Sequence, residues 1–297
     1  AEKSRNLAKI KLGKVAYGED LAETTKQVRH LPTIAELAND YLERHAQRKR
    51  DKSFKEDQRL LKSHIIPSWG SIKVANIDRR EIEDLHKNLG KKPYQANRVI
   101  ALASKMFSLA VSWGWRADNP VVGIQKYQEE KRDRWLDEEE LQRLWAILDE
   151  YPQHLTAYIF KFLLLTGARK GEAMQATWDQ FNLEKGIWTK PSHLTKQKKT
   201  EYLPLSEQTL NILQEVKKLS SNSVYLFPGR IDGQPIKELK TFWKTVIKSA
   251  KLENVRIHDL RHTHASHLVS SGLSLSIVGK LLGHTQASTT QRYAHLA

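Results

Sequence analysis

Apolar residues recur at helical spacing in the first half of the chain, and capping residues mark where those helices begin. An apolar stripe at i, i+3 and i+4 predicts an amphipathic helix, and a Ser, Thr or Asp three residues before a Glu predicts its first turn. We therefore expect a compact domain of four helices in residues 31–120. The predicted helix starts are Thr33 with Glu36, Ser53 with Glu56, Asp78 with Glu81, and Pro93. The stretch Ile66-Pro67-Ser68-Trp69-Gly70 predicts a turn after the second helix.

Residues 135–297 combine helical spacing with a short β-rich stretch. Alternating residues around Gly186-Ile187-Trp188-Thr189 and Glu201-Tyr202-Leu203-Pro204-Leu205 enclose a lysine-rich tip, which predicts a small antiparallel sheet with a basic hairpin. Helices are expected from Asp137 with Glu140, over the apolar run Leu155–Leu165, and at about 206–218, 236–250, 258–271, 274–282 and 286–295. The fold expected is mainly α with a small antiparallel β-sheet, in two domains.

Two stretches without apolar periodicity flank the first expected domain. Residues 1–30 are polar and basic, and they predict a helix followed by a tether. Residues 121–134 are polar and charged, which indicates a flexible linker. They lie between the helical domain at 31–120 and the second domain at 135–297.

The composition limits the classes of protein to which the chain can belong. Hydrophobic residues make up 39% of the 297 residues, and no apolar run approaches the roughly 20 residues of a transmembrane helix. The N-terminal residues show no secretory signal. The sequence has no cysteine, which excludes disulfides, thiolate catalysis and cysteine-ligated zinc and fits a reducing cytoplasm.

The net charge of +15 comes from 49 Lys and Arg against 34 Asp and Glu, and both halves of the chain are basic. A long anionic surface, with nucleic acid as the first candidate, is the partner that this favours; a basic protein without such a partner is the alternative. One dense basic cluster predicts an edge that contacts DNA phosphates, although cations also suit a solvated helix end. Its members are Arg44, Arg48, Lys49, Arg50, Lys52 and Lys55.

Four polar clusters in the second domain are candidates for chemistry. They are Arg169 with Glu172, Lys196, His258 with Arg261, and His284 with Tyr293. Taken singly, each has an ordinary explanation, such as an i,i+3 helical pair or a solvated hairpin lysine. Taken together, they are the groups that phosphoryl transfer needs. Two arginines can hold the non-bridging oxygens, a lysine or histidine can protonate the leaving oxygen, and a phenol can attack.

Metal-dependent alternatives fit the sequence less well. No pair of carboxylates has the pattern of a two-metal nuclease, and neither an H-E-x-x-H zinc motif nor a G-x-x-x-x-G-K phosphate loop is present. Because lysine and arginine can supply the positive charge, we expect the reaction to run without a metal ion or another cofactor.

The ordered motifs resemble those of the tyrosine recombinases, or phage-type integrases, over residues 31–297. They are Thr166-Gly167-Ala168-Arg169-Lys170-Gly171-Glu172, His258-Asp259-Leu260-Arg261-His262-Thr263, Leu281-Leu282-Gly283-His284, and Tyr293. The resemblance implies a core-type DNA-binding domain at 31–120 and a catalytic domain at 135–297. It also implies a site-specific recombinase that needs no ATP and integrates or excises a mobile element.

The resemblance also implies a role for each motif residue. Arg169 and Arg261 would hold the scissile phosphate, His258 would assist in proton transfer, and His284 would donate to a phosphate oxygen. Tyr293 would attack to form a 3′-phosphotyrosyl bond and release a 5′-hydroxyl. Lys196 matches the hairpin lysine that acts as general acid, with Lys198 and Lys199 close by, and Glu172 would orient the arginine site. Which group accepts the proton of Tyr293 stays open.

The expected partner is double-stranded DNA at attachment or core sites in a prokaryotic cytoplasm. We expect a homotetramer on synapsed DNA and a monomer without DNA. In integrases of genomic islands and satellite phages, a stretch like Leu12-Gly13-Lys14-Val15-Ala16-Tyr17-Gly18-Glu19-Asp20 follows an arm-binding domain. We therefore expect this chain to lack that domain, and, because it ends four residues after Tyr293, to lack a docking tail as well.

Two other functions remain open at this point. A type IB topoisomerase-like enzyme would use the same chemistry to relax DNA without a defined site. A DNA-binding regulator would keep the same residues only for structural reasons.

Overall fold

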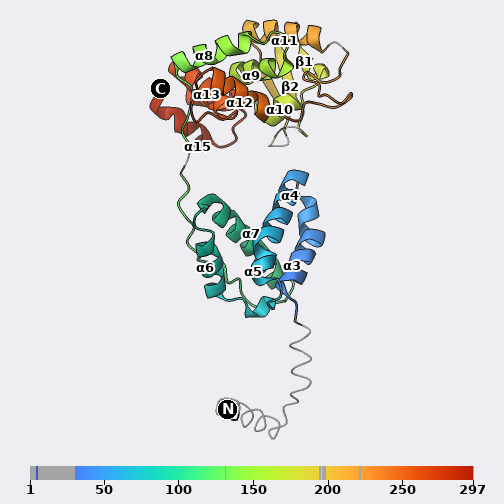
Figure 1. Cartoon of the computed structure of the whole chain (residues 1–297), viewed down its shortest axis with the longest axis vertical. Helices are drawn as coiled ribbons and strands as arrows, with labels where there is room; N and C mark the ends of the chain where they lie inside the picture. The colour runs from blue at the N-terminus through green and yellow to red at the C-terminus, as the bar shows by residue number, and fades with distance from the viewer. Residues whose placement is uncertain are drawn as a thin grey trace. The chain divides into compact units, whose positions relative to one another are not determined.

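The computed structural model describes residues 5, 31–130, 132–193, 195, 199–220 and 222–296. It divides the chain into two compact units, Ala1–Lys131 and Arg132–Ala297, and Figure 1 labels many of their helices and strands. The helix and tether predicted for residues 1–30 lie outside the described residues, apart from Arg5. Each unit is built around its own apolar core.

Helices form the first unit. Its buried apolar residues come from every helix and include Leu37, Leu61, Ile82, Val99 and Phe107. The elements are α3 (Ile34–Asp40), η1 (Tyr41–His45), η2 (Ala46–Arg48), α4 (Asp51–Leu60), η3 (Leu61–Ile65), α5 (Ile66–Trp69), η4 (Val74–Asn76), α6 (Arg79–Asn88) and α7 (Pro93–Ser112). The capping boxes predicted at Thr33 and Asp78 are confirmed, as is the start of α7 at Pro93.

The predicted start of the second helix at Ser53 is wrong. Helix α4 begins at Asp51, because Arg50 has the extended backbone of an N-cap residue and the chain is already helical at Ser53. Glu56, expected to complete a capping box, instead accepts hydrogen bonds from Arg59 at 2.8 and 2.9 Å. The Glu56 carboxylate, which the local sequence pattern predicted to cap the helix, therefore binds the Arg59 guanidinium instead.

The turn predicted at Ile66–Gly70 is also wrong over most of its length. Helix α4 continues through the π-helical segment η3 into α5, so the chain stays helical to Trp69. Pro67, which has no backbone N–H to donate, lies at the start of α5, where the bonding changes from the π-helical pattern of η3. The turn comes at Gly70, where a Cβ would lie 2.6 Å from the carbonyl oxygen of Ile66.

The end of the first unit includes most of the segment predicted as a linker. Val121 is buried in the first core, and Asn97 Nδ2 donates to the carbonyl oxygen of Tyr127 at 2.8 Å. On the other side of the division, Arg132 packs into the second unit. The flexible linker predicted at residues 121–134 stays a prediction.

The second unit places a buried helix among other helices and a small sheet. Helix α9 packs against α8, α10, α11 and α13, and its apolar residues face the core on nearly all sides. The helical elements are α8 (Glu138–Asp149), α9 (Leu155–Thr166), α10 (Lys170–Met174), η5 (Trp178–Gln180), α11 (Glu207–Leu219), α12 (Lys240–Ser249), α13 (Asp259–Ser270), α14 (Leu275–Leu281), α15 (Ala287–Thr290) and η6 (Gln291–Leu296). The predicted capping box of Asp137 with Glu140 is confirmed.

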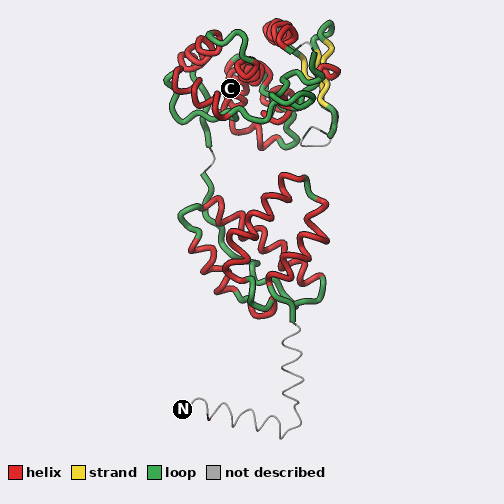
Figure 2. The backbone as a smooth tube through the Cα atoms, turned by 45° about the vertical axis from the view of Figure 1, so that its right-hand side comes forward, coloured by secondary structure: helices red, strands yellow, loops and turns green. Residues whose placement is uncertain are grey.

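The predicted antiparallel sheet is confirmed and has the strand order β1-β2-β3. Its strands are β1 (Phe181–Asn182), β2 (Ile187–Lys190) and β3 (Glu201–Pro204), and they lie together at one side of the unit in Figure 2. Trp188 pairs with Leu203, and both side chains are buried. The fold is thus mainly α with a small antiparallel sheet. Among the described residues, no helix is long and apolar enough to cross a membrane.

Candidate active site

Two glycines in left-handed turns bring together the arginines that the motifs single out. Gly167 ends α9 with φ +60°, and Gly283 follows α14 with φ +63°. The guanidinium of Arg261 donates to the carbonyl oxygens of Gly167 at 2.7 Å and Leu282 at 2.6 Å. Arg169 in turn donates to the carbonyl oxygen of Gly283 at 3.2 Å. Arg261 therefore donates to the turn next to Arg169, and Arg169 donates to the turn next to Arg261. These bonds connect residues that are 94 and 114 positions apart in the sequence.

Glu172 fixes the direction of Arg169. Arg169 is the N-cap residue of α10, and its guanidinium donates to the Glu172 carboxylate at 2.6 Å while its backbone N–H donates at 3.2 Å. The Glu172 side chain is 4% exposed and that of Arg169 is 24% exposed, so the arginine keeps an accessible edge. Arg261 is buried, and burial together with the charge of Arg169 lowers its pKa to about 10. It stays charged at neutral pH.

A buried lysine beneath the arginines was not predicted as part of the site. Lys190 on β2 is 2% exposed, and its Nζ lies 3.3 Å from Glu172 and 3.7 Å from Glu201. Burial lowers the pKa of Lys190, and the two carboxylates oppose this. The available signal was the alternation of β2, which places Lys190 on the same inward face as Trp188. A lysine at an inward position indicates a buried carboxylate partner.

Tyr293 lies in η6 with a buried side chain, and its hydroxyl lies 2.5 Å from Nδ1 of His262. Burial raises the pKa of Tyr293, while the charges of Arg292 and Arg261 act in the opposite direction. His262 was not singled out from the sequence. It follows His258 by four residues, which is one helical turn, and their rings lie 5.1 Å apart. That spacing was the available signal.

His258 and His284 differ in their surroundings. His258 is an exposed residue, yet partial burial of its ring and the charge of Arg261 lower its pKa. His284 Nδ1 lies 2.9 Å from Oγ1 of Thr290. Burial and the charges of Arg261 and Arg169 lower the pKa of His284 to about 4, so the ring is neutral at neutral pH. A Thr290 hydroxyl that donates to Nδ1 leaves the ring proton on Nε2.

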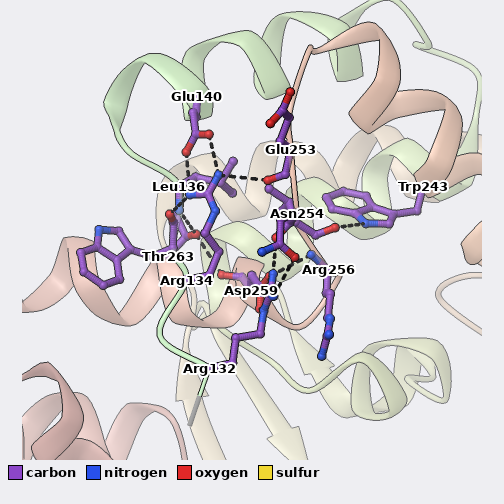
Figure 3. A network of polar contacts seen from close by, with 12 residues as sticks. Arg132, Arg134, Leu136, Glu140, Trp243, Glu253, Asn254, Arg256, Asp259 and Thr263 are labelled. Atoms are coloured by element: carbon purple, nitrogen blue, oxygen red, sulfur yellow. Dashed lines mark hydrogen bonds and ion pairs between the residues drawn. The ribbon is translucent and has the colours of Figure 1, made fainter. Parts of the chain in front are cut away.

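The segment before α8 is fastened to the same region (Figure 3). Asp259 follows His258 and accepts hydrogen bonds from Arg132 at 2.6, 3.1 and 3.2 Å and from the backbone N–H of Arg256 at 2.8 Å. The carbonyl oxygen of Arg132 accepts a bond from Arg292 at 2.6 Å. Arg132 thus contacts the neighbours of both His258 and Tyr293.

Lys196 lies outside the described residues, in the sequence between β2 and β3. Within the described part of the chain, no group of three or more His, Asp or Glu side chains is placed to hold a metal ion.

The basic cluster predicted to contact DNA lies at the end of the first helical stretch and in α4. Arg44 pairs with Asp40 at 3.1 Å and lies 5.5 Å from the Trp113 ring. Lys49 donates to Asp57 at 2.7 Å and is half-buried. The remaining members are exposed and are Arg48, Arg50, Lys52 and Lys55. Contact with DNA stays a prediction for all of them.

Known proteins resemble the chain in sequence and in structure. Residues 134–297 match the phage integrase family, and residues 34–127 match the phage integrase central domain. The integrase of Salmonella phage P22 is 27% identical over 238 residues, which cover 72% of this chain and 59% of that protein. A shufflon-specific DNA recombinase of Escherichia coli is 28% identical over 238 residues, which cover 78% of this chain and 57% of that protein. The chain thus spans less than two thirds of these two relatives.

The fold has counterparts among solved structures. A lambda integrase dimer bound to a COC′ core site matches with a TM-score of 0.73 and 17% identity, over 88% of this chain and 95% of that chain. At this level of identity the match concerns the fold.

Proposed function

Because the chain belongs to the phage integrase family, the tyrosine recombinases, we propose that it is a site-specific DNA recombinase. It would cleave and rejoin DNA strands through a 3′-phosphotyrosyl intermediate and thereby integrate or excise a mobile element. The observation that carries this proposal is the crossed bonding of Arg169 and Arg261, with Tyr293 close enough for the charge of Arg261 to act on its pKa. Two cations and a buried phenol are the arrangement that attack on a phosphodiester requires.

The two arginines bind the scissile phosphate in this mechanism. Each engages some N–H groups on protein oxygens, Arg261 on two carbonyls and Arg169 on Glu172 and Gly283, and these bonds fix the planes of the guanidinium groups. Their other N–H groups donate to the non-bridging oxygens, where negative charge increases in the transition state. Glu172 positions Arg169 and does not contact the DNA.

The other residues handle protons. His284 donates its Nε2–H to a phosphate oxygen as a neutral imidazole, and His258 assists in proton transfer. The oxygen of Tyr293 forms a bond to phosphorus while the bond from phosphorus to the 5′ oxygen breaks. Lys196 gives a proton to that leaving oxygen, which becomes a 5′-hydroxyl. No metal ion, ATP or other cofactor takes part.

Reversal of this step by another strand gives recombination. The phosphotyrosyl bond keeps the energy of the cleaved bond, so a 5′-hydroxyl from a second duplex can attack it. Since each protomer supplies one Tyr293 and two duplexes have four strands, the active assembly is a homotetramer on synapsed attachment or core sites.

The protein is a monomer without DNA and works in the cytoplasm. The basic cluster from Arg44 to Lys55 contacts DNA phosphates.

Covalent trapping tests this function. Nicked duplexes from candidate attachment sites, in which the short cleaved strand diffuses away, should accumulate a protein–DNA adduct with the wild-type chain. Tyr293→Phe should bind the duplex and form no adduct. Tyr202→Phe is the matched control, because Tyr202 is 72% exposed in the same unit, and it should form adducts as the wild type does.

Each other outcome indicates a different function. Adducts with Tyr293→Phe would move the nucleophile elsewhere. Adducts of the wild type on any duplex, with relaxation of supercoiled DNA and no joining of two sites, would indicate a topoisomerase. Binding without adducts would indicate a regulator. Excess EDTA should leave adduct formation unchanged, and a strict requirement for magnesium would contradict the mechanism.

A further inference from the structure

We propose that His262 is a catalytic residue that accepts the phenolic proton of Tyr293 as this tyrosine attacks the DNA. The inference rests on the proposed recombinase function and names the group that carries out one of its proton transfers. His262 lies outside the motif positions to which a role was assigned above.

The contact between the two side chains has the geometry of proton transfer. Nδ1 of His262 lies 2.5 Å from the Tyr293 oxygen, and the ring centroids lie 6.0 Å apart. A general base must lie within hydrogen-bond reach of the proton that it removes. The phenol belongs to a side chain that is 2% exposed, so bulk water has little access to it. The proton therefore needs an acceptor inside the protein.

The surrounding charges keep this acceptor free. Burial, followed by the charges of Arg292 and His258, lowers the pKa of His262 to about 4, with Arg261 acting in the same direction and Asp259 against it. The ring is consequently neutral at neutral pH. In the tautomer with its proton on Nε2, Nδ1 accepts the bond from the Tyr293 hydroxyl. A phosphodiester bound by the arginines brings a negative charge that offsets these cations, so His262 becomes a stronger base when DNA is bound.

The step balances with one proton accepted and one donated. The lone pair of Nδ1 takes the phenolic proton while the tyrosine oxygen bonds to phosphorus, and His262 becomes an imidazolium. The bond to the 5′ oxygen breaks, and Lys196 gives that oxygen its proton. On rejoining, the tyrosine oxygen leaves phosphorus and recovers its proton from His262.

Substitution with asparagine separates proton acceptance from positioning. The amide oxygen of an Asn can accept a hydrogen bond near the place of Nδ1 but cannot take up a proton. Single-turnover adduct formation by His262→Asn on the nicked attachment-site duplex should be slower by a factor on the order of 10²–10⁴, the range of general base catalysis. The rate should rise with pH, and duplex binding should be unchanged. His267→Asn is the matched control, because His267 is exposed on the same helix.

A sulfur leaving group distinguishes His262 from the general acid. In a duplex with a bridging 5′-phosphorothiolate, the leaving thiolate needs no proton, since a thiol has a pKa near 8.5. On this duplex the cleavage rate of Lys196→Ala should return to near the wild-type rate, whereas His262→Asn should still cleave slowly. If His262→Asn cleaved the phosphorothiolate duplex as fast as the wild type but the unmodified duplex slowly, His262 would be an acid. If His262→Asn cleaved the unmodified duplex at the wild-type rate, His262 would only be a positioning residue. Either result overturns the proposal.

The contact can also be tested without DNA. In the full chain labelled with ¹⁵N-histidine, Tyr293→Phe should shift the Nδ1 resonance of His262, because it removes the donated hydrogen bond. An unchanged resonance would show that the contact is absent in solution and would overturn the proposal. A wild-type chain that forms no adduct on any duplex would instead remove the recombinase function itself, which separates the two failures.

Discussion

Arg132 and Asp259 are 127 residues apart in the chain, and the guanidinium of Arg132 donates to both carboxylate oxygens of Asp259. The Asp259 side chain is 2% exposed and follows His258 directly. The backbone carbonyl of Arg132 accepts a hydrogen bond from Arg292, which precedes Tyr293. One residue at the start of the second unit therefore holds both the helix that carries the histidines and the segment that carries the tyrosine.

Removal of this guanidinium should loosen α13. Arg132→Ala leaves Asp259 buried with the Arg256 N–H as a remaining partner, so the local free energy of opening should fall by about 1–3 kcal/mol. Hydrogen exchange of the α13 amides measures this change. Lys218→Ala is the control, because its ion pair with Glu215 is 70% and 50% exposed and such pairs contribute about 0–1 kcal/mol. Unchanged protection of α13 in Arg132→Ala would contradict the anchoring role.

A second prediction concerns the turn that ends α9. In Gly167→Ala, the new Cβ would lie 2.5 Å from the His264 ring and 2.8 Å from Leu282, in addition to the strain of φ +60°. The free energy of unfolding should fall by about 2–5 kcal/mol, from strain of about 1–2 and overpacking of about 1–3 kcal/mol. Adduct formation should fall with it, because the Gly167 carbonyl holds Arg261.

Gly272→Ala is the matched control for that turn. Gly272 has φ +89° and no neighbour within 4 Å of an added Cβ, so it carries the strain without the collision. Its cost, measured by the same urea titration, should be about 1–2 kcal/mol. Equal costs for the two substitutions would show that the His264 ring moves aside freely.

Local patterns predicted most helix starts because both partners of a capping box lie within one turn. Thr33, Asp78 and Asp137 each cap a helix as expected. Ser53 has the same spacing to Glu56, but Arg59 is also within reach of that carboxylate and binds it. The local rule fails where a competing side chain lies on the same helix face.

Local sequence patterns could not predict contacts between segments that lie far apart in the chain. The motifs singled out Arg169 and Arg261, and the structure brings both to facing turns. Lys190 and His262 were missed, because their partners Glu172 and Tyr293 lie 18 and 31 residues away. The packing of η6 against α13, for example, is what brings Tyr293 to His262. The roles assigned to these residues stay predictions.

Acid should weaken the arginine site through Glu172. Burial alone raises the pKa of Glu172, but the charges of Lys190 and Arg169 outweigh it and hold the pKa below its ordinary value of 4.5. A carboxyl with a lower pKa in the folded chain stabilises it above the unfolded pKa, and this stabilisation is lost as pH falls through the folded pKa. Glu172→Gln should therefore be less stable than the wild type above pH 4.5, and the difference should shrink below it.

Urea titrations at a series of pH values measure that difference. Glu215→Gln is the control, because the Glu215 side chain is 50% exposed and its replacement should change stability little across the same range. A difference between Glu172→Gln and the wild type that does not depend on pH would contradict the charge-based explanation.

The hydroxyl of Thr290 should set the tautomer of His284. Thr290 is buried with its Oγ1 2.9 Å from Nδ1, so Thr290→Val keeps the shape of the side chain and removes the bond. The His284 ring can then lose its proton from Nε2, and adduct formation should slow by roughly tenfold, which corresponds to one hydrogen bond of about 1.4 kcal/mol. Thr289→Val, at the exposed neighbouring position, should cleave as the wild type does. An equal rate for Thr290→Val would show that the phosphate alone fixes the His284 tautomer.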